Sequence, residues 1–341
     1  MLSHSKTNFV QVYDTWDVHA RSAYHYTKDI DVSSGVDLSK YDSIIFAGMG
    51  GSATAGEIAA SLLNRSAPRC AVLKGSVLPE GIDDNTLVIV SSISGNTYEM
   101  INVLKSCLSR RIDAISISSG GELEKLSLMH GVFHIRVQNL GAPRISLPCV
   151  VYPVLNVLKN IEKGIEQEIQ LSLESLSELS PLINSSVPTE RNIAKQLASF
   201  MQDITPICYH SPLMGPAGIR FKNSLNENAK KHVICDDIEE VCHNGIVPFS
   251  YEEPDRYGVV FLRSKGEEGM LSKKFDALQT FLRGRRIRFF EAFSFGESML
   301  AKLMCSIYLL DFSSIYLALL KGYDPSLTPA IDYIKSALRD E

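Results

Sequence analysis

Short apolar runs alternate with stretches of helical periodicity along the first 150 residues. Helical spacing of apolar side chains occurs at 14–28, 57–63 and 98–109. The apolar runs lie at 43–47, 70–73, 86–90, 113–117 and 131–135. Short buried strands that alternate with helices are typical of a parallel sheet covered on both faces. The pattern therefore predicts a doubly wound α/β domain.

The same alternation starts again after residue 205. Apolar runs that predict strands lie at 205–209, 232–234, 257–262 and 286–290. Helical patterns lie at 217–231, 275–283, 298–320 and 329–339. The residues between the two halves, 155–202, are mostly helical in pattern, and we interpret the Ser- and Glu-rich part at 172–188 as a connector. We predict two α/β domains, 1–155 and 156–341, each with a parallel sheet flanked by helices.

Composition narrows the class of protein. With 34 basic and 39 acidic residues the formal net charge is -5, which argues against binding nucleic acid by phosphate neutralisation. The seven cysteines include no C-x-x-C pair and are odd in number, which suits a reducing compartment. The first ten residues lack an apolar signal core, and no uninterrupted apolar run reaches the ~18 residues of a membrane span. We expect a cytoplasmic protein with no nucleic-acid or membrane partner.

A glycine cluster follows the first predicted strand, where residues 48–53 read G-M-G-G-S-A. The spacing can be fitted to the dinucleotide fingerprint G-x-G-x-x-A, which requires an acidic residue at the end of the next strand. That position holds Lys74. A second interpretation is that the glycines only permit a tight strand-to-helix turn.

A second polar loop follows the third predicted strand, where residues 92–97 read S-I-S-G-N-T. Backbone N–H groups and the helix dipole at such a place attract an anion, and short hydroxyls add donors without bulk. A helix cap needs only one hydroxyl, so three exceed the requirement of capping. The loop predicts a phosphate site at the carboxyl edge of the sheet, where ligands of open parallel sheets bind.

These two loops together resemble the sugar isomerase (SIS) domain. The resemblance implies two doubly wound, flavodoxin-like SIS subdomains. It also implies that Ser92, Ser94 and Thr97 bind the phosphate of a sugar phosphate, with Gly51 and Ser52 lining the approach. SIS domains also occur as regulators, so a non-catalytic sugar-phosphate sensor is an alternative to an enzyme.

Two motifs in the second half narrow the resemblance. Residues 226–230 read N-E-N-A-K, and residues 240–244 read E-V-C-H-N. They resemble the archaeal-type bifunctional phosphoglucose/phosphomannose isomerases. The resemblance implies that Glu227 is the base that moves a proton between C1 and C2 through a cis-enediolate. It implies that His243 assists ring opening, and that it does so from the partner subunit of a homodimer.

Three further residues match positions of the same family. The resemblance implies that Arg144 stabilises the enediolate, that Lys335 lies near the ring oxygen, and that Thr328 leaves room for both C2 epimers. The implied activity interconverts glucose 6-phosphate and/or mannose 6-phosphate with fructose 6-phosphate, as an intramolecular oxidoreductase. An isomerase of another sugar phosphate is an alternative.

No metal or organic cofactor is expected, because the proton transfer is intramolecular and the enediolate can be held by a fixed cation and polar donors. Cys235, Cys242 and His243 lie close together in the sequence. No second ligand cluster in the sequence completes a tetrahedral metal site with them. The expected partners are therefore a small-molecule sugar phosphate and a second copy of the chain.

Overall fold

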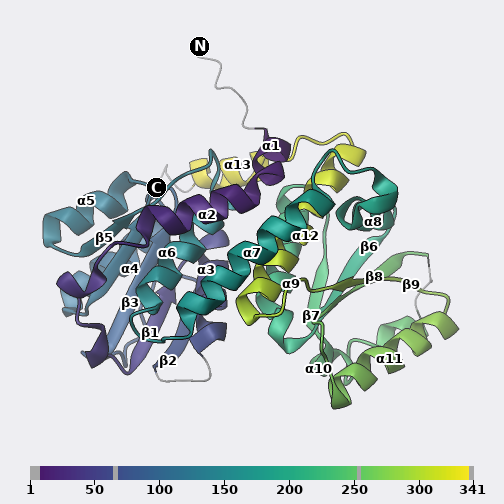
Figure 1. Ribbon diagram of the computed structural model, residues 1–341, viewed down its shortest axis with the longest axis horizontal. Coiled ribbons are helices and arrows are strands. Elements are labelled where there is room, and N and C mark those ends of the chain that lie inside the picture. The colour runs from purple at the N-terminus through teal and green to yellow at the C-terminus, as the bar shows by residue number, and fades with distance from the viewer. Residues whose placement is uncertain (1–7, 64–67, 252–254, 338–341) are drawn as a thin grey trace, which may run out of the picture. The chain divides into compact units, whose positions relative to one another are not determined.

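The computed structural model describes residues 8–63, 68–251 and 255–337, which fold into two compact α/β units (Figure 1). The first-sheet unit comprises Thr15–Pro181 and Ser294–Ser306. The second-sheet unit comprises Met1–Asp14, Leu182–Phe293 and Ile307–Glu341. Both units are discontinuous in sequence, whereas the sequence pattern predicted a single boundary after residue 155.

The first-sheet unit contains five parallel strands. They are β1 (Ser43–Ala47), β2 (Arg69–Leu73), β3 (Thr86–Ser92), β4 (Ala114–Ser118) and β5 (Phe133–Arg136). Their order is β2-β1-β3-β4-β5, the flavodoxin-like arrangement. Every residue of the central β3 is buried, as its continuous apolar run predicts. The predicted α/β fold class is confirmed.

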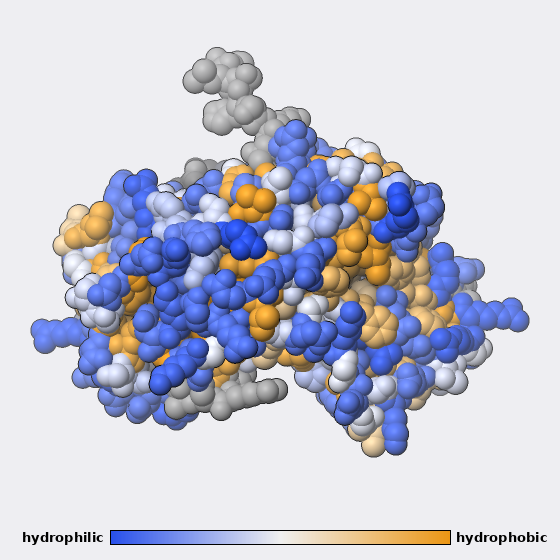
Figure 2. Space-filling model, viewed as in Figure 1, coloured by the Kyte–Doolittle hydropathy of each residue, from blue (hydrophilic) through white to orange (hydrophobic). Residues whose placement is uncertain are grey.

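Helices cover both faces of this sheet because alternate strand residues point to opposite sides. Ile45 and Val88 pack with α4 (Tyr98–Arg110) and α5 (Gly121–His130) on one face. Phe46 packs against α3 (Gly51–Leu63) on the other face. The helices α6 (Pro148–Leu158) and α2 (Trp16–Thr27) complete that layer. The solvent side of α2 is largely hydrophilic in Figure 2.

The second-sheet unit repeats the arrangement with four parallel strands. They are β6 (Thr205–His210), β7 (Ile234–Asp237), β8 (Tyr257–Arg263) and β9 (Arg288–Phe293), in the order β7-β6-β8-β9. One face packs on α10 (Ile238–Val241) and α11 (Gly269–Gly284). The helix α9 (Gly215–Glu227) packs on β6 and β7. The unit also contains α1 (Phe9–Asp14), α8 (Ile193–Phe200) and α13 (Pro329–Ala337).

Two details of the sequence prediction are wrong. The region interpreted as a connector is mostly helix, because α7 (Ile165–Ile183) buries apolar side chains at helical spacing. The buried side chains of α7 include Ile169, Leu173, Leu176 and Leu179. The helix predicted at 217–231 ends at Glu227, and the strand expected at 232 begins at Ile234. The last part of the predicted tail helix, at Arg339, lies outside the described residues.

Among the described residues, one helix has the length and apolar composition needed to cross a membrane. This helix is α12 (Met299–Leu320), and 89% of its most apolar 18-residue window is buried inside the protein. Such burial is typical of a core helix, whose apolar surface is covered by other protein segments. The helix begins in the first-sheet unit and continues in the second-sheet unit from Ile307.

Candidate functional site

The turn between β1 and α3 requires glycine. A Cβ atom at Gly48 would lie 2.6 Å from the backbone carbon of Ser52 and 2.7 Å from the backbone nitrogen of Ala53. The Ser52 N–H donates to the Met49 carbonyl at 3.1 Å. The glycine cluster thus lets α3 begin directly against the carboxyl end of its strand, so that the N-terminus of the helix faces that edge of the sheet.

The loop between β3 and α4 holds its hydroxyl groups in a network of its own. The Ser92 and Thr97 hydroxyls lie 2.8 Å apart, and the Gly95 N–H donates to Ser92 Oγ at 3.2 Å. Thr97 occupies the N-cap of α4, but its side chain makes no capping hydrogen bond within the described part of the chain. The Thr97 hydroxyl is therefore not used to cap α4, and the N-terminal end of this helix can attract an anion.

The same loop is fixed from behind. Gly95 has a φ of 65°, and a Cβ atom there would lie 1.7 Å from the Gly120 carbonyl oxygen. The Ser119 backbone N–H and hydroxyl both donate to the Ile93 carbonyl, at 3.0 and 2.6 Å. These contacts restrain the loop, which lowers the entropic cost of binding a ligand there.

A small cavity of about 50 Å³ lies where these segments meet. Its lining contains all five residues expected to bind or approach phosphate, namely Gly51, Ser52, Ser92, Ser94 and Thr97. Sequence reasoning missed Met49, Ser91 and Pro143, which also line it. Arg144 follows Pro143 in the short 3-10 helix Pro143–Ser146 and is half-buried. The structure thus places Arg144 directly after a residue of the cavity wall.

The end of β2 offers no carboxylate for a ribose. Lys74 follows this strand and forms an ion pair with Glu57 of α3. A dinucleotide site needs an unpaired acidic side chain at this place. The arrangement therefore favours a phosphate group over a dinucleotide at the loops.

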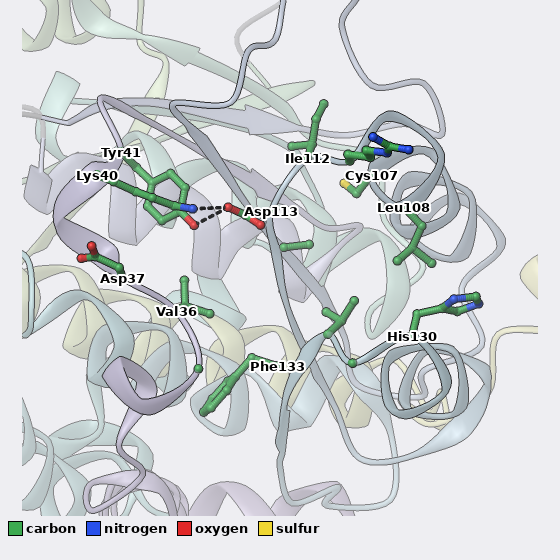
Figure 3. Close-up of a pocket in the computed structure, with 15 residues that line it drawn as sticks. Val36, Asp37, Lys40, Tyr41, Cys107, Leu108, Ile112, Asp113, His130 and Phe133 are labelled. Atoms are coloured by element: carbon green, nitrogen blue, oxygen red, sulfur yellow. Dashed lines mark hydrogen bonds and ion pairs between the residues drawn. The ribbon is translucent and has the colours of Figure 1, made fainter.

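A larger cavity, of about 330 Å³, lies at the opposite edge of the same sheet (Figure 3). In Figure 3, Lys40 and Tyr41 both point toward Asp113, at 2.6 and 2.8 Å. The hydrogen bond from Lys40, together with that from Tyr41, lowers the pKa of Asp113. Lys40 and Asp113 neutralise each other in this cavity, which lies away from the carboxyl edge where ligands of such sheets bind.

Glu227 is the last residue of α9, in the second-sheet unit. Its carbonyl accepts a hydrogen bond from the Lys230 ammonium at 2.6 Å, and the same ammonium donates to the Asp324 carbonyl at 3.1 Å. Asn228 is buried and donates to the Ser314 hydroxyl of α12 at 2.9 Å. The N-E-N-A-K motif and the segment at Asp324, which are far apart in sequence, are therefore joined at the candidate base.

A buried network fixes α9 to α12. The Arg220 guanidinium forms an ion pair with Asp311 at 2.8 Å, and the Tyr13 hydroxyl donates to the same carboxylate at 2.7 Å. Burial lowers the pKa of Arg220, but the electrostatic interactions with Asp311, Tyr13 and Glu227 outweigh burial. The pKa of Arg220 is therefore raised above its ordinary value. Sequence reasoning missed Asp311, although a single acidic residue in a long apolar helix was the signal that could have identified it.

The other candidate residues of this unit lie on loops and on the last helix. His243 is exposed in the turn after α10, where its N–H donates to the Glu240 carbonyl at 2.9 Å. The Thr328 carbonyl accepts the N–H groups of Ile331 and Asp332, at the start of α13. Lys335 is exposed on α13. Within one chain, His243 and Lys335 thus face solvent.

Comparison with known families supports the division into two sheets. Residues 37–137 match the SIS domain. Residues 190–338 match the bacterial phospho-glucose isomerase C-terminal SIS domain. The two matched ranges together include every candidate site residue except Arg144.

Similar proteins cover almost the whole chain. A bifunctional phosphoglucose/phosphomannose isomerase of Caldicellulosiruptor bescii is 28% identical over 94% of this chain and 96% of its own. One of Aquifex aeolicus is 28% identical over 89% of this chain and 92% of its own. A D-glucosamine-6-phosphate 4-epimerase of Sulfolobus acidocaldarius is 25% identical over 72% of this chain and 74% of its own.

Solved structures agree on the fold. A hypothetical protein from Thermus thermophilus has a TM-score of 0.77 at 14% identity, and the match covers 99% of this chain and 91% of that protein. At this identity the likeness shows the fold alone. The family matches and the relatives together show more: both halves of the chain match SIS-domain models, and the chain is similar along most of its length to the bifunctional phosphoglucose/phosphomannose isomerases.

Proposed function

We propose that the chain is an aldose–ketose isomerase that interconverts glucose 6-phosphate and/or mannose 6-phosphate with fructose 6-phosphate. The observation that carries this proposal is the preformed cavity at the loop between β3 and α4. Its hydroxyls, backbone N–H groups and helix N-termini are the donors that a phosphate monoester binds. The names of the relatives that match most of the chain support the sugar as a hexose.

Glu227 serves as the base of the proposed reaction. It takes the proton from C2 of the open-chain aldose and returns it to C1, so that a cis-enediolate forms and collapses to the ketose. Arg144 holds the negative charge that develops on the enediolate oxygens. The Lys230 bridge and the buried Asp311 network support this assignment, because both restrain the end of α9 that carries Glu227.

The remaining residues act on the ring and the epimer. His243 and Lys335 assist ring opening at the ring oxygen, and Thr328 leaves room for either configuration at C2. His243 is exposed in the single chain, which supports its reaching the site of a second copy in a homodimer. A non-catalytic sugar-phosphate sensor would use the same phosphate loop but would not require Glu227.

The test is to incubate the purified, EDTA-treated protein with fructose 6-phosphate and to quantify glucose 6-phosphate and mannose 6-phosphate separately. Formation of both products supports the dual specificity and its independence of metal. One product alone retains the Glu227 mechanism and rejects the dual specificity. If neither product forms while fructose 6-phosphate protects the protein against thermal unfolding, the sensor replaces the enzyme.

A parallel incubation with glucosamine 6-phosphate tests the activity in the name of the Sulfolobus acidocaldarius relative, a D-glucosamine-6-phosphate 4-epimerase. Epimerisation at C4 of that substrate, without any reaction of fructose 6-phosphate, would contradict the proposed substrate. Mixing Glu227→Gln protein with His243→Ala protein tests the homodimer. Activity recovered by subunit exchange supports one site built from two copies, and no recovery contradicts it.

A further inference from the structure

Two cysteines and a histidine share one face of the second sheet. In the parallel pairing of β6 with β7, Cys208 lies opposite Cys235 and His210 lies opposite Asp237. Because strand side chains alternate, these four residues all point to the same face. The core residues Ile207 and Tyr209 point to the other face. The helix α9 covers the cysteine side, and β7 is the edge strand.

The cluster closes around a glycine of α9. A Cβ atom at Gly218 would lie 2.6 Å from His210 Cδ2 and 3.3 Å from Cys235 Sγ. Cys235 and His210 thus both lie against α9 at this glycine, and Cys208 is the strand partner of Cys235. His210 Nδ1 also lies 3.0 Å from the Ser211 carbonyl and 3.9 Å from the Asp237 carboxylate. The imidazole is therefore held between a thiol and an acidic group.

The two thiols differ in access and in ionisation. Cys208 is completely buried, whereas Cys235 is half-buried. Hydrogen bonds from Cys208 and His210, and the positive charges of His210 and Lys222, lower the pKa of Cys235 despite its burial. The hydrogen bond with Cys235, together with burial, raises the pKa of Cys208. Cys235 is thus the reactive thiol, and Cys208 is its protected neighbour.

Two other half-buried cysteines provide an internal contrast. Burial raises the pKa of Cys70 to about 11 and also raises that of Cys242. In the described part of the chain, neither has a cationic neighbour that opposes the effect of burial. Among the described residues, no three His, Cys, Asp or Glu side chains are arranged to share a metal ion. The cluster therefore fits redox chemistry of a thiol pair.

We propose that Cys235 and Cys208 form a reversible redox pair, in which Cys235 reacts first with a hydroperoxide and Cys208 then closes a disulfide. This inference is independent of the proposed isomerase activity. The strands that carry the pair are neighbours, and neighbouring strands lie about 4.8 Å apart. That spacing is within the roughly 4.4–6.8 Å between Cα atoms that a disulfide spans.

Formation of the disulfide consumes one hydroperoxide. The Cys235 thiolate attacks a peroxide oxygen, the O–O bond breaks, and the departing oxygen takes the proton held by His210, leaving a sulfenic acid on Cys235. The Cys208 sulfur then attacks the Cys235 sulfur. The S–S bond forms, the S–O bond breaks, and the Cys208 proton leaves with the hydroxyl group as water. Two exchanges with a dithiol reductant restore both thiols.

The test uses the full chain with Cys242→Ser, because Cys242 and Cys235 share a tryptic peptide while Arg220 and Lys231 separate them from Cys208. The protein is treated with a few equivalents of hydrogen peroxide, alkylated and digested. We expect a disulfide-linked pair of peptides containing Cys208 and Cys235, which dithiothreitol abolishes. Recovery of Cys208 and Cys235 alkylated to the same extent as Cys70 would overturn the proposal.

Two variants separate the steps. With Cys208→Ser, we expect Cys235 to stop at the sulfenic acid, which dimedone traps as a mass adduct on that residue. With His210→Asn, we expect dimedone labelling of Cys235 in the same Cys208→Ser background to slow on the order of tenfold. Equal labelling of Cys70 and Cys235 in the Cys208→Ser protein would show that the cluster does not activate Cys235.

Discussion

The loops that follow β3 and β8 occupy the same place in their two sheets, but only one of them is left open to an anion. After β3, the Ser92 and Thr97 hydroxyls bond to each other beside a cavity. After β8, the Glu267 carboxylate accepts the Ser264 N–H at 2.6 Å and the Arg263 guanidinium at 3.0 Å. The second sheet thus fills its loop with a carboxylate from its own chain.

This difference shows what topology decides and what side chains decide. The strand order brings a strand-to-helix loop to the carboxyl edge in both sheets, so both loops can attract negative charge. In the second-sheet unit, Arg263 also pairs with Glu291 at 3.0 Å, and Arg220 pairs with Asp311. These two buried cations are therefore neutralised by carboxylates of the same unit.

The largest expected effect separates chemistry from phosphate binding. Glu227→Gln removes the proposed base while keeping the shape of the side chain, so kcat should fall on the order of 10³- to 10⁴-fold. The protection that fructose 6-phosphate gives against thermal unfolding should remain. Steady-state kinetics and thermal unfolding of the same preparation measure both quantities. Near-normal turnover in the variant would reject Glu227 as the base.

The buried ion pair between Arg220 and Asp311 should contribute the next largest effect. Asp311→Asn leaves the buried Arg220 without its counter-ion, so the free energy of unfolding should fall by about 3–5 kcal/mol. Urea unfolding followed by circular dichroism measures the loss. Asp332→Asn, at an exposed position of the same unit, is the matched control and should change little. Equal losses of unfolding free energy in the two variants would mean that the buried network stabilises the protein no more than an exposed carboxylate does.

Substitutions in the loop between β3 and α4 should weaken substrate binding. Ser94→Ala combined with Thr97→Val removes two hydroxyl donors to the phosphate, so KM should rise on the order of tenfold to a hundredfold, and more than kcat falls. Ser264→Ala in the closed loop is the control and should leave KM unchanged. A KM that is unchanged in the double variant would place the phosphate elsewhere.

The closed loop can be opened by substitution. Glu267→Ser removes the carboxylate that Arg263 and Ser264 bind, so the free energy of unfolding should fall by about 1–3 kcal/mol. Added sulfate should then stabilise the variant more than the parent protein, because an anion can replace the missing carboxylate. Thermal unfolding with and without sulfate provides the measurement. Identical sulfate responses would contradict the equivalence of the two loops.

The smallest effect concerns the ion pair between Lys40 and Asp113, in the larger cavity at the amino edge of the first sheet. Lys40 lowers the folded-state pKa of Asp113, so the stabilisation is present above the unfolded-state pKa of about 4 and is lost as the pH falls through the folded-state value. Both side chains are about half-exposed, which limits the contribution to roughly 0.5 kcal/mol. The stability difference between the parent protein and Asp113→Asn, measured by urea unfolding across this pH range, should therefore disappear at acid pH.

The strands β1, β3, β4, β6 and β8 could be predicted from sequence because each is a local, mostly buried run, and every residue of β3 is buried. The second half of α7, from residue 172, could not, because its serines and glutamates obscured the regular spacing of Leu173 and Leu176. The hydroxyl-rich loop at 92–97 could also be identified from sequence, since its hydroxyls lie within six residues of the chain. The carboxylate of Glu267 and the pairing of Asp311 depend on contacts that no local pattern contains.

The discontinuous units have a consequence for the order in which the protein is made. Tyr13 is synthesised long before its hydrogen-bonding partner Asp311, which is 298 residues further along. The first-sheet unit likewise receives Ser294–Ser306 only after the four strands of the second sheet have been synthesised. The nascent chain must therefore keep α1 available until α12 has emerged.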